Sequence, residues 1–197
     1  LFLLFWNCQK TATHFEKRKE ETSLIYTLTT NPAVDLNICS DGMVSNLVNR
    51  VHGSVYTPNG KGLNVSFVLG HFGIPSVIAG FFGGFTGDYI EKETRNRGYD
   101  MLSVHVEEIT RINIFLNDGK DEYKFVNRGS YVSQTKQKEM LDQLEKASDM
   151  ECLVISGSLP PGIQDSYYEQ IFEVCQKHQS KVVLDNSSRK LQELLCF

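Results

Sequence analysis

From residue 61 onward, apolar segments with helical spacing alternate with short apolar runs of strand length, and this alternation limits the chain to the α/β class. Helices are expected at 63–72, 86–97, 133–147, 164–178 and 187–195, and strands at 76–82, 152–156 and 181–184. A strand rich in β-branched residues is expected earlier, at 24–30, where Asn31-Pro32 ends it. Strands that alternate with helices pair in parallel, so we expect a mostly parallel sheet covered by helices.

Two β-rich segments, at about 36–57 and 101–126, do not fit this alternation. The first contains several β-forming residues, and the second contains short runs at 102–106, 112–116 and 123–126. Asn117-Asp118-Gly119 lies between the last two runs and is a typical hairpin signal. We therefore expect a small second β-layer beside the main sheet.

Charge and hydropathy exclude two classes of partner. The 197 residues carry a net charge of −4, and lysine and arginine are scattered, which does not suit non-specific binding to nucleic acid. The apolar run at residues 1–6 is too short to cross a membrane, and no basic stretch precedes it. Residues 1–23 show neither helical nor strand period, so we expect them to lie outside the fold, as a disordered or artefactual leader.

The cysteines indicate a reducing environment. They are odd in number and include no pair with C-x-x-C spacing, so they provide neither a zinc signature nor a disulfide framework. We expect buried free thiols and a cytoplasmic location. The five are Cys8, Cys39, Cys152, Cys175 and Cys196.

The segment at 59–62, Asn-Gly-Lys-Gly, directly precedes a helix and has the composition of an anion site. Glycines let backbone N–H groups approach a ligand, the helix N-terminus favours an anion, and Lys61 adds a positive charge. The segment is not a Walker A loop, because Val55 and Gly62 stand where that loop needs Gly and Ser or Thr. On its own, it is equally compatible with a glycine turn that only begins a helix.

Two further segments follow predicted strands, where open α/β sheets bind ligands. Asp35, in Asn-Pro-Ala-Val-Asp at 31–35, places a carboxylate after the first strand. Ser-Gly-Ser-Leu-Pro-Pro-Gly at 156–162 follows a buried strand and forms a rigid loop of small residues and prolines. Together with the Gly-Lys-Gly segment, these loops predict a ligand site at the carboxyl edge of the sheet.

From about residue 24 to 195, the chain resembles the ribokinase-like (phosphofructokinase B) family of carbohydrate kinases. The resemblance implies an α/β fold that is a three-layer αβα sandwich, with the second β-layer acting as a lid and with residues 24–197 as a partial kinase domain. The motifs follow the family's order: Asn-Pro-Ala-x-Asp at 31–35, Val-Asn-Arg at 48–50, Gly-Lys-Gly-x-Asn at 60–64, a glycine-rich stretch at 80–88, Thr-Arg-x-Asn at 110–113 and Ser-Gly-Ser-Leu-Pro-Pro-Gly at 156–162.

The resemblance implies ATP-dependent phosphorylation of a sugar phosphate, with Mg²⁺ as the metal. D-Fructose 1-phosphate is the expected substrate and fructose 1,6-bisphosphate the product, as in the 1-phosphofructokinase branch. Tagatose 6-phosphate is the alternative, because this sequence resembles the tagatose-6-phosphate kinase branch nearly as closely as it resembles the 1-phosphofructokinase branch. A homodimer through the lids is also implied.

By the same resemblance, Asp35 would bind sugar hydroxyls, and Gly60, Lys61 and Asn64 would hold the sugar from the floor of the cleft. Ser158 would line the sugar site. An aspartate after a strand is often only a cap, which is the alternative interpretation of Asp35.

Arg50 and Arg111 would clamp the phosphate that the substrate already carries, which suits the bidentate fork of arginine. For each, an exposed arginine on a strand surface is the alternative. Asp185, at the end of the last strand, would approach the magnesium–phosphate region.

The catalytic segment of the family is not found. Phosphoryl transfer needs a base for the attacking hydroxyl and donors for the charge that develops on the phosphoryl group. The family takes both from a late Gly-Ala-Gly-Asp segment, which does not occur in this sequence. We therefore expect a C-terminally incomplete domain without turnover. A non-catalytic sugar-phosphate-binding fragment is the alternative to a fragment of an enzyme.

Overall fold

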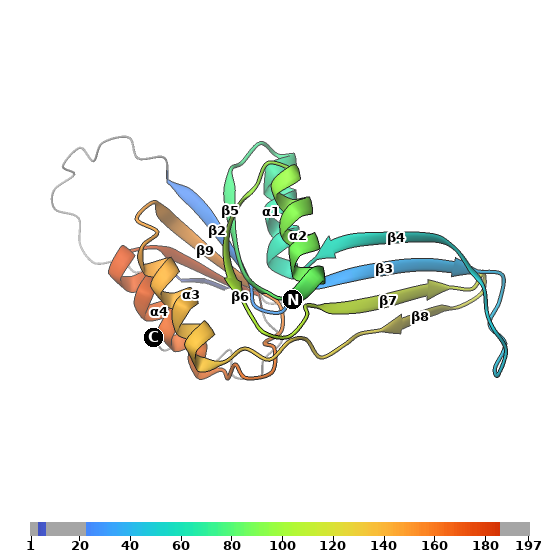
Figure 1. Ribbon diagram of the computed structural model, residues 1–197. Coiled ribbons are helices and arrows are strands. Elements are labelled where there is room, and N and C mark those ends of the chain that lie inside the picture. Colours follow the sequence, from blue (N-terminus) through green and yellow to red (C-terminus); the bar gives the residue numbers. More distant parts are fainter. Residues whose placement is uncertain (1–3, 7–22, 186–197) are drawn as a thin grey trace.

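The main sheet places the first predicted strand at its centre. The computed structural model describes residues 4–6 and 23–185. The six strands of this sheet have the order β1-β10-β9-β2-β5-β6, and all except β1 are parallel (Figure 1). The parallel strands are β2 (Leu24–Thr29), β5 (Ser76–Phe82), β6 (Asp100–His105), β9 (Met150–Ser156) and β10 (Lys181–Asp185).

Four helices of the described part of the chain cover the two faces of this sheet, as the sequence predicts. The first two are α1 (Lys61–His71), which precedes β5, and α2 (Gly84–Asn96), which follows it. The other two are α3 (Gln134–Glu145), which precedes β9, and α4 (Ser166–His178), which follows it. Helix α1 lies on β2 and β5, α2 lies on β5 and β6, and α4 lies on β9 and β10. The fold is therefore a three-layer αβα sandwich, as expected. The additional helix predicted at 187–195 lies outside the described residues.

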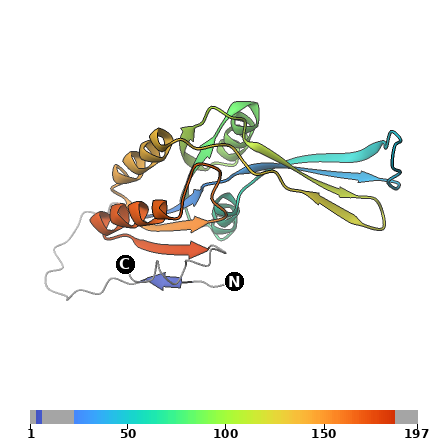
Figure 2. The ribbon, with the colours of Figure 1, turned by 90° about the horizontal axis from the view of Figure 1, so that it is seen from below.

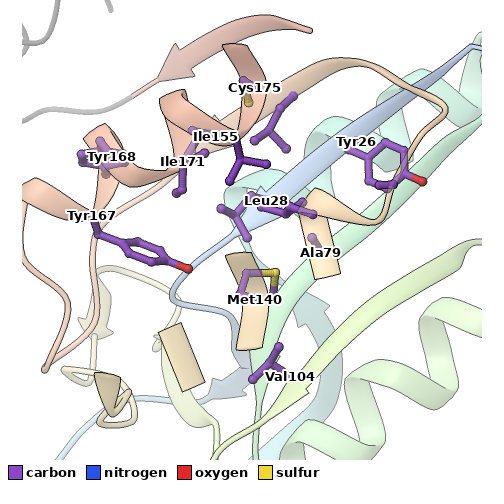
Figure 3. Close-up of a cluster of buried hydrophobic side chains, with 14 of the residues drawn as sticks. Tyr26, Leu28, Ala79, Val104, Met140, Ile155, Tyr167, Tyr168, Ile171 and Cys175 are labelled. Carbon is purple, nitrogen blue, oxygen red and sulfur yellow. The ribbon is translucent and has the colours of Figure 1, made fainter. Parts of the chain in front are cut away.

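Strand β5 shows how one apolar run serves both layers. All seven of its residues are buried. Val77, Ala79 and Phe81 pack with the α3 and α4 side, whereas Ile78 and Phe82 pack with α1 and α2. Because side chains alternate across a strand, a central strand between two helical layers must be apolar at every position. Figure 3 shows the larger cluster, in which Leu28 and Ala79 of the sheet face Met140 of α3 and Ile171 of α4.

Helix α3 begins where the sequence predicts. The Ser133 hydroxyl oxygen accepts a hydrogen bond from the Lys136 backbone N–H at 3.4 Å. The reciprocal half of a capping box requires Glu or Gln at position 136, and lysine cannot supply it. The cap is therefore partial, as expected.

The second sheet projects from the body as a long ribbon (Figures 1 and 2). Its strand order is β4-β3-β7-β8, with β3 parallel to β7 and the other neighbours antiparallel. We call this sheet the lid. Its strands are β3 (Ala33–Ser40), β4 (Val51–Asn59), β7 (Arg111–Asn117) and β8 (Glu122–Phe125). The predicted hairpin joins β7 to β8, and β3 and β4 are longer than the short strands that the sequence suggested.

One part of the predicted lid is wrong. Residues 100–105 form β6, which pairs in parallel with β5 in the main sheet. The physical reason is the helix between them: β5, α2 and β6 form a crossover unit, and such a unit returns the chain to the same sheet. The lid therefore takes only β7 and β8 from the later β-rich segment.

The N-terminal segment also differs from expectation. Residues 1–23 were expected to lie outside the fold, yet Leu4–Trp6 forms β1, which pairs antiparallel with Val182, Val183 and Leu184 of β10. Strand β10 otherwise presents an unpaired edge, and an unpaired edge accepts any strand of suitable length. The rest of the predicted leader lies outside the described residues, apart from Ser23.

The cysteines fit the prediction only in part. Cys175 is buried, and burial raises the pKa of its thiol to about 12. Cys152 is half-buried, and burial raises the pKa of its thiol as well. Cys39 is exposed on the lid strand β3, contrary to the prediction of a buried thiol. All three are free, and the other two cysteines lie outside the described residues.

Candidate functional site

The candidate site lies where the lid joins the carboxyl edge of the main sheet. Strands β2, β9 and β10 end side by side at this edge, at Thr29, Ser156 and Asp185. Only three residues, Thr30, Asn31 and Pro32, separate the end of β2 from the start of β3, so the lid begins directly after the central strand of the main sheet. Every predicted site residue except Arg50 lies at or near this junction.

Asp35 forms the centre of a polar network at the root of the lid. It is 8% exposed, and its Oδ1 accepts a hydrogen bond from Asn113 Nδ2 at 2.9 Å. Its Oδ2 accepts a second hydrogen bond from Asn59 Nδ2. A carboxylate offers about four lone-pair sites, so this one retains acceptors for ligand hydroxyls. Asp35 lies inside β3, and the alternative of a simple cap does not apply.

Asn59 connects this carboxylate to α1. Its Oδ1 accepts hydrogen bonds from the Gly60 backbone N–H and from Asn64 Nδ2, both at 2.7 Å. A continuous chain of polar side chains thus runs from the lid to the first turn of α1. Asn59 and Asn113 both stand in or beside motifs that the sequence singled out, although neither was given a role.

The glycines at the start of α1 have a packing role. A Cβ on Gly62 would lie 2.8 Å from the backbone carbon and oxygen of Leu28, and one on Gly60 would meet the side chain of Thr29. Thr29 Oγ1 accepts a hydrogen bond from the Leu63 backbone N–H at 2.9 Å, which fixes the helix against β2. The sequence suggested that these glycines bring the backbone close to a ligand, whereas at Gly62 the close approach is to β2.

Lys61 points toward the end of β10. Its Nζ lies 3.9 Å from Asp185 Oδ2, and the two side chains are 59% and 30% exposed. Asp185 Oδ2 also accepts a hydrogen bond from Ser156 Oγ at 2.8 Å. The structure therefore brings Lys61 and Asp185 together, in an exposed pair that contributes little to stability by itself.

Arg111 is a half-buried cation beside Asp35. Its Nε, Nη1 and Nη2 donate to the main-chain oxygens of Pro32, Asn127 and Asn31, at 3.3, 2.7 and 2.9 Å. Burial lowers the pKa of Arg111, and the charge of Asp35 opposes that shift. A guanidinium has five N–H donors, so donors remain for an anion. A freely exposed surface arginine would not be held in this way.

The structure does not bring Arg50 to Arg111 within one chain. Arg111 is paired with Ala33 at the root of the lid, whereas Arg50 directly precedes Val51, which is paired with Ser40 at the other end of β3. At about 3.3 Å per residue, these positions lie roughly 23 Å apart along the strand. The two arginines therefore cannot share one phosphate in a single copy of this chain.

Ser158 lies on the loop after β9 and is held by the chain that leaves β2. Its main-chain oxygen accepts a hydrogen bond from Thr30 Oγ1 at 3.0 Å, and its hydroxyl oxygen accepts one from Asn31 Nδ2 at 3.3 Å. Ser158 is an exposed residue. Asn31 could not be given a binding role from the sequence, because asparagine before proline is typical of a turn.

Comparison with known proteins identifies the family of this chain. Residues 25–196 match the pfkB family of carbohydrate kinases. The chain belongs to this family. D-Tagatose-1-phosphate kinase of Klebsiella oxytoca is 44% identical over 172 residues, which are 87% of this chain and 57% of that protein. 1-Phosphofructokinase of Bacillus subtilis is 34% identical over 168 residues, which are 85% of this chain and 55% of that protein.

A solved phosphofructokinase structure has a similar fold. The crystal structure of phosphofructokinase-2 from Escherichia coli in complex with fructose-6-phosphate matches with a TM-score of 0.79 at 26% identity. The match covers 89% of this chain and 58% of that one. The chain thus spans a little over half the length of the pfkB kinases it matches.

The described residues of this pfkB chain contain no group of three or more His, Cys, Asp or Glu side chains placed to hold an ion. Asp185, the predicted metal ligand, contacts Ser156 and Lys61. Among the described helices, none combines the length and apolar character required to cross a membrane.

Proposed function

We propose that the chain forms the sugar-phosphate half of a kinase that phosphorylates a ketohexose 1-phosphate. One observation carries this proposal: the half-buried Arg111 guanidinium lies beside the Asp35–Asn59–Asn113 network. A cation with free N–H donors suits an anionic group, and a carboxylate flanked by amides suits hydroxyls. A phosphosugar presents both groups on one small molecule, whereas a free sugar has no anionic group for the remaining guanidinium donors.

D-Fructose 1-phosphate, converted to fructose 1,6-bisphosphate, remains our proposed substrate, and D-tagatose 1-phosphate is its close competitor. These two sugars differ only in the configuration of one hydroxyl. The names of the related proteins support a 1-phosphate, because the relatives include a tagatose-1-phosphate kinase and a 1-phosphofructokinase. Tagatose 6-phosphate stays an alternative through the tagatose-6-phosphate kinase of Staphylococcus epidermidis, which is 32% identical.

ATP and Mg²⁺ belong to the proposed activity of the whole protein. The Gly-Ala-Gly-Asp segment that the family resemblance leads us to expect does not occur in the sequence. For this chain itself, we propose binding of sugar phosphate without turnover. The free thiols support a cytoplasmic location as part of the same proposal.

Thermal unfolding with added ligand tests the proposed function. A ligand that binds only the folded chain at 100 times its Kd stabilises it by about 2.7 kcal/mol, which corresponds to a rise in midpoint of roughly 5–11 °C for a domain of this size. We expect such a rise with fructose 1-phosphate or tagatose 1-phosphate, a smaller one with tagatose 6-phosphate, and none with fructose or ATP.

Arg111→Lys provides the matched control for this experiment, because lysine keeps the positive charge but lacks the planar guanidinium that can bind a phosphate with two N–H groups. It should reduce the rise in midpoint caused by fructose 1-phosphate by at least half. The proposed function would be wrong if the parent chain melted cooperatively but no sugar phosphate raised its midpoint.

We further propose that a second copy of the chain completes the phosphate site through the lid. Arg50 is exposed at the end of the lid that lies away from the main sheet, so a ligand bound beside Arg111 can contact Arg50 only if Arg50 comes from a second copy of the chain. The lid and the segments next to its strands also carry several exposed apolar side chains, and such patches mark interfaces. They are Met43, Val44, Leu47, Val48, Val51, Val55, Tyr56, Phe125 and Val126.

Val48→Glu tests this dimer, since Val48 is 83% exposed and its substitution should leave the monomer fold intact. We expect light scattering to give a dimer for the parent chain and a monomer for the variant. The fructose 1-phosphate affinity of the variant should fall to that of Arg50→Ala. A monomeric variant with unchanged affinity would show that Arg50 does not act across the interface.

A further inference from the structure

Asn31 connects three parts of the site at the point where β2 passes into the lid. It is buried, and its Nδ2 donates to Ser158 Oγ at 3.3 Å and to the Arg128 main-chain oxygen at 3.2 Å. Its own main-chain oxygen accepts from Arg111 Nη2 at 2.9 Å. One residue thus touches the candidate phosphate-binding side chain, the loop after β9 and the loop that leads from β8 to α3.

The loop from β8 to α3 packs tightly against the Asn31 side chain. Gly129 has a φ of +96°, and a Cβ on it would clash with the side-chain oxygen of Asn31. The same loop supplies the Asn127 main-chain oxygen that accepts from Arg111 Nη1 at 2.7 Å. Of the three carbonyls that hold the guanidinium, one is therefore the main-chain oxygen of Asn31, and another lies on the loop that packs against the Asn31 side chain.

The backbone at Asn31 is itself restricted. Pro32 follows it, and a residue before proline is limited to extended conformations. Thr30, on its other side, donates to the Ser158 main-chain oxygen at 3.0 Å. The chain between β2 and β3 is therefore fixed at several points before any ligand binds.

We propose that Asn31 is a positioning residue that fixes Arg111 and Ser158 relative to each other. It binds no substrate itself. Its role is to hold the phosphate-binding end and the sugar-binding end of the site at one spacing, so that a single small molecule contacts both. The identity of that ligand rests on the proposed function, whereas the position of the Arg111 guanidinium does not.

The first test therefore uses the full chain without ligand. In a ¹H–¹⁵N spectrum, the Nε–H of Arg111 should give a resolved and protected signal, because Nε donates to the Pro32 main-chain oxygen. Arg111→Lys identifies that signal by its loss. In Asn31→Ala, its exchange with water should be at least about tenfold faster, while the amides of β3 and β7 keep their protection.

The second test measures binding of fructose 1-phosphate and of inorganic phosphate by calorimetry. Asn31→Ala should weaken fructose 1-phosphate about tenfold to thirtyfold and inorganic phosphate less than about threefold, because only the larger ligand needs both ends of the site. The double variant with Arg111→Lys should be less than additive, since both changes act on one group.

Ser130→Ala is the matched control. Ser130 Oγ donates to the Ile109 main-chain oxygen at 2.8 Å and anchors the same loop without touching Arg111 or Ser158. Equal effects of Asn31→Ala and Ser130→Ala on exchange or binding would overturn the proposal, and so would an unchanged Nε–H signal in Asn31→Ala. If the parent chain binds no sugar phosphate, the proposed function fails, and the Arg111 signal still decides the role of Asn31.

Discussion

Asp35→Asn is expected to weaken fructose 1-phosphate binding at least about 100-fold. The carboxylate accepts from Asn59 and Asn113, and its remaining acceptors are the ones available to sugar hydroxyls. Hydrogen bonds to a charged acceptor contribute about 1.5–3 kcal/mol each, so the loss of two corresponds to roughly that factor. An amide at position 35 also places an N–H₂ group against two other amide donors, which leaves a buried donor unsatisfied. Titration calorimetry on the purified variant measures the change.

Asn37→Ala is the control for Asp35→Asn. Asn37 lies two residues further along β3 and therefore on the same face of the lid, but it is exposed. Its replacement should change the free energy of unfolding by less than about 0.5 kcal/mol and leave affinity unchanged. Binding of Asp35→Asn within about threefold of the parent would exclude Asp35 from the sugar site.

Gly62→Ala is expected to cost about 3 kcal/mol of stability. The new Cβ would lie 2.8 Å from the backbone carbon and oxygen of Leu28, and neither β2 nor α1 can move without disturbing the sheet centre. Overpacking against backbone falls at the upper end of the usual range of 1–3 kcal/mol. The midpoint of thermal unfolding should fall by roughly 6–12 °C.

Gly70→Ala separates this clash from the general effect of alanine in a helix. Gly70 lies on the same helix, but its Cβ would meet the end of the Tyr99 side chain, which can turn aside. Alanine is also the better helix former by about 1 kcal/mol. Gly70→Ala should therefore lower the midpoint far less than Gly62→Ala, and equal losses would mean that contact with Leu28 is not the cause.

Most of the main sheet could be predicted because its strands carry strong local signals. The fully apolar run at 76–82 and the amphipathic helices around it specify an α/β sandwich from their periodicity alone. Strand β6 was misplaced because its sequence, Asp-Met-Leu-Ser-Val-His, alternates like a lid strand. Strand β6 joins the main sheet because helix α2 connects it to β5, and the sequence of the strand itself does not show this.

From the sequence, site candidates could be named only where a charged residue stands in a distinctive position or in a family motif. Asp35 follows a predicted strand, Lys61 stands between two glycines at a helix start, and Arg111 was named through the family resemblance. Asn31, Asn59 and Asn113 were given no role, since asparagine is common in turns and its role here depends on which partners it reaches. The separation of Arg50 from Arg111 follows from the length of β3, which the irregular pattern at 36–57 did not reveal.

The order of strands in the main sheet has a consequence for synthesis on the ribosome. Strand β2 emerges early, but its neighbour β9 follows more than a hundred residues later, and the hydrogen bond from Tyr26 to Asp149 joins positions 123 apart. At about 5–20 residues per second, the ribosome needs roughly 6–25 s to add that length. During this time, β2 can pair with β5 on one edge only, and the other edge stays open to any nearby strand. The rate of translation and the supply of chaperones should therefore influence how much of this chain reaches its native pairing.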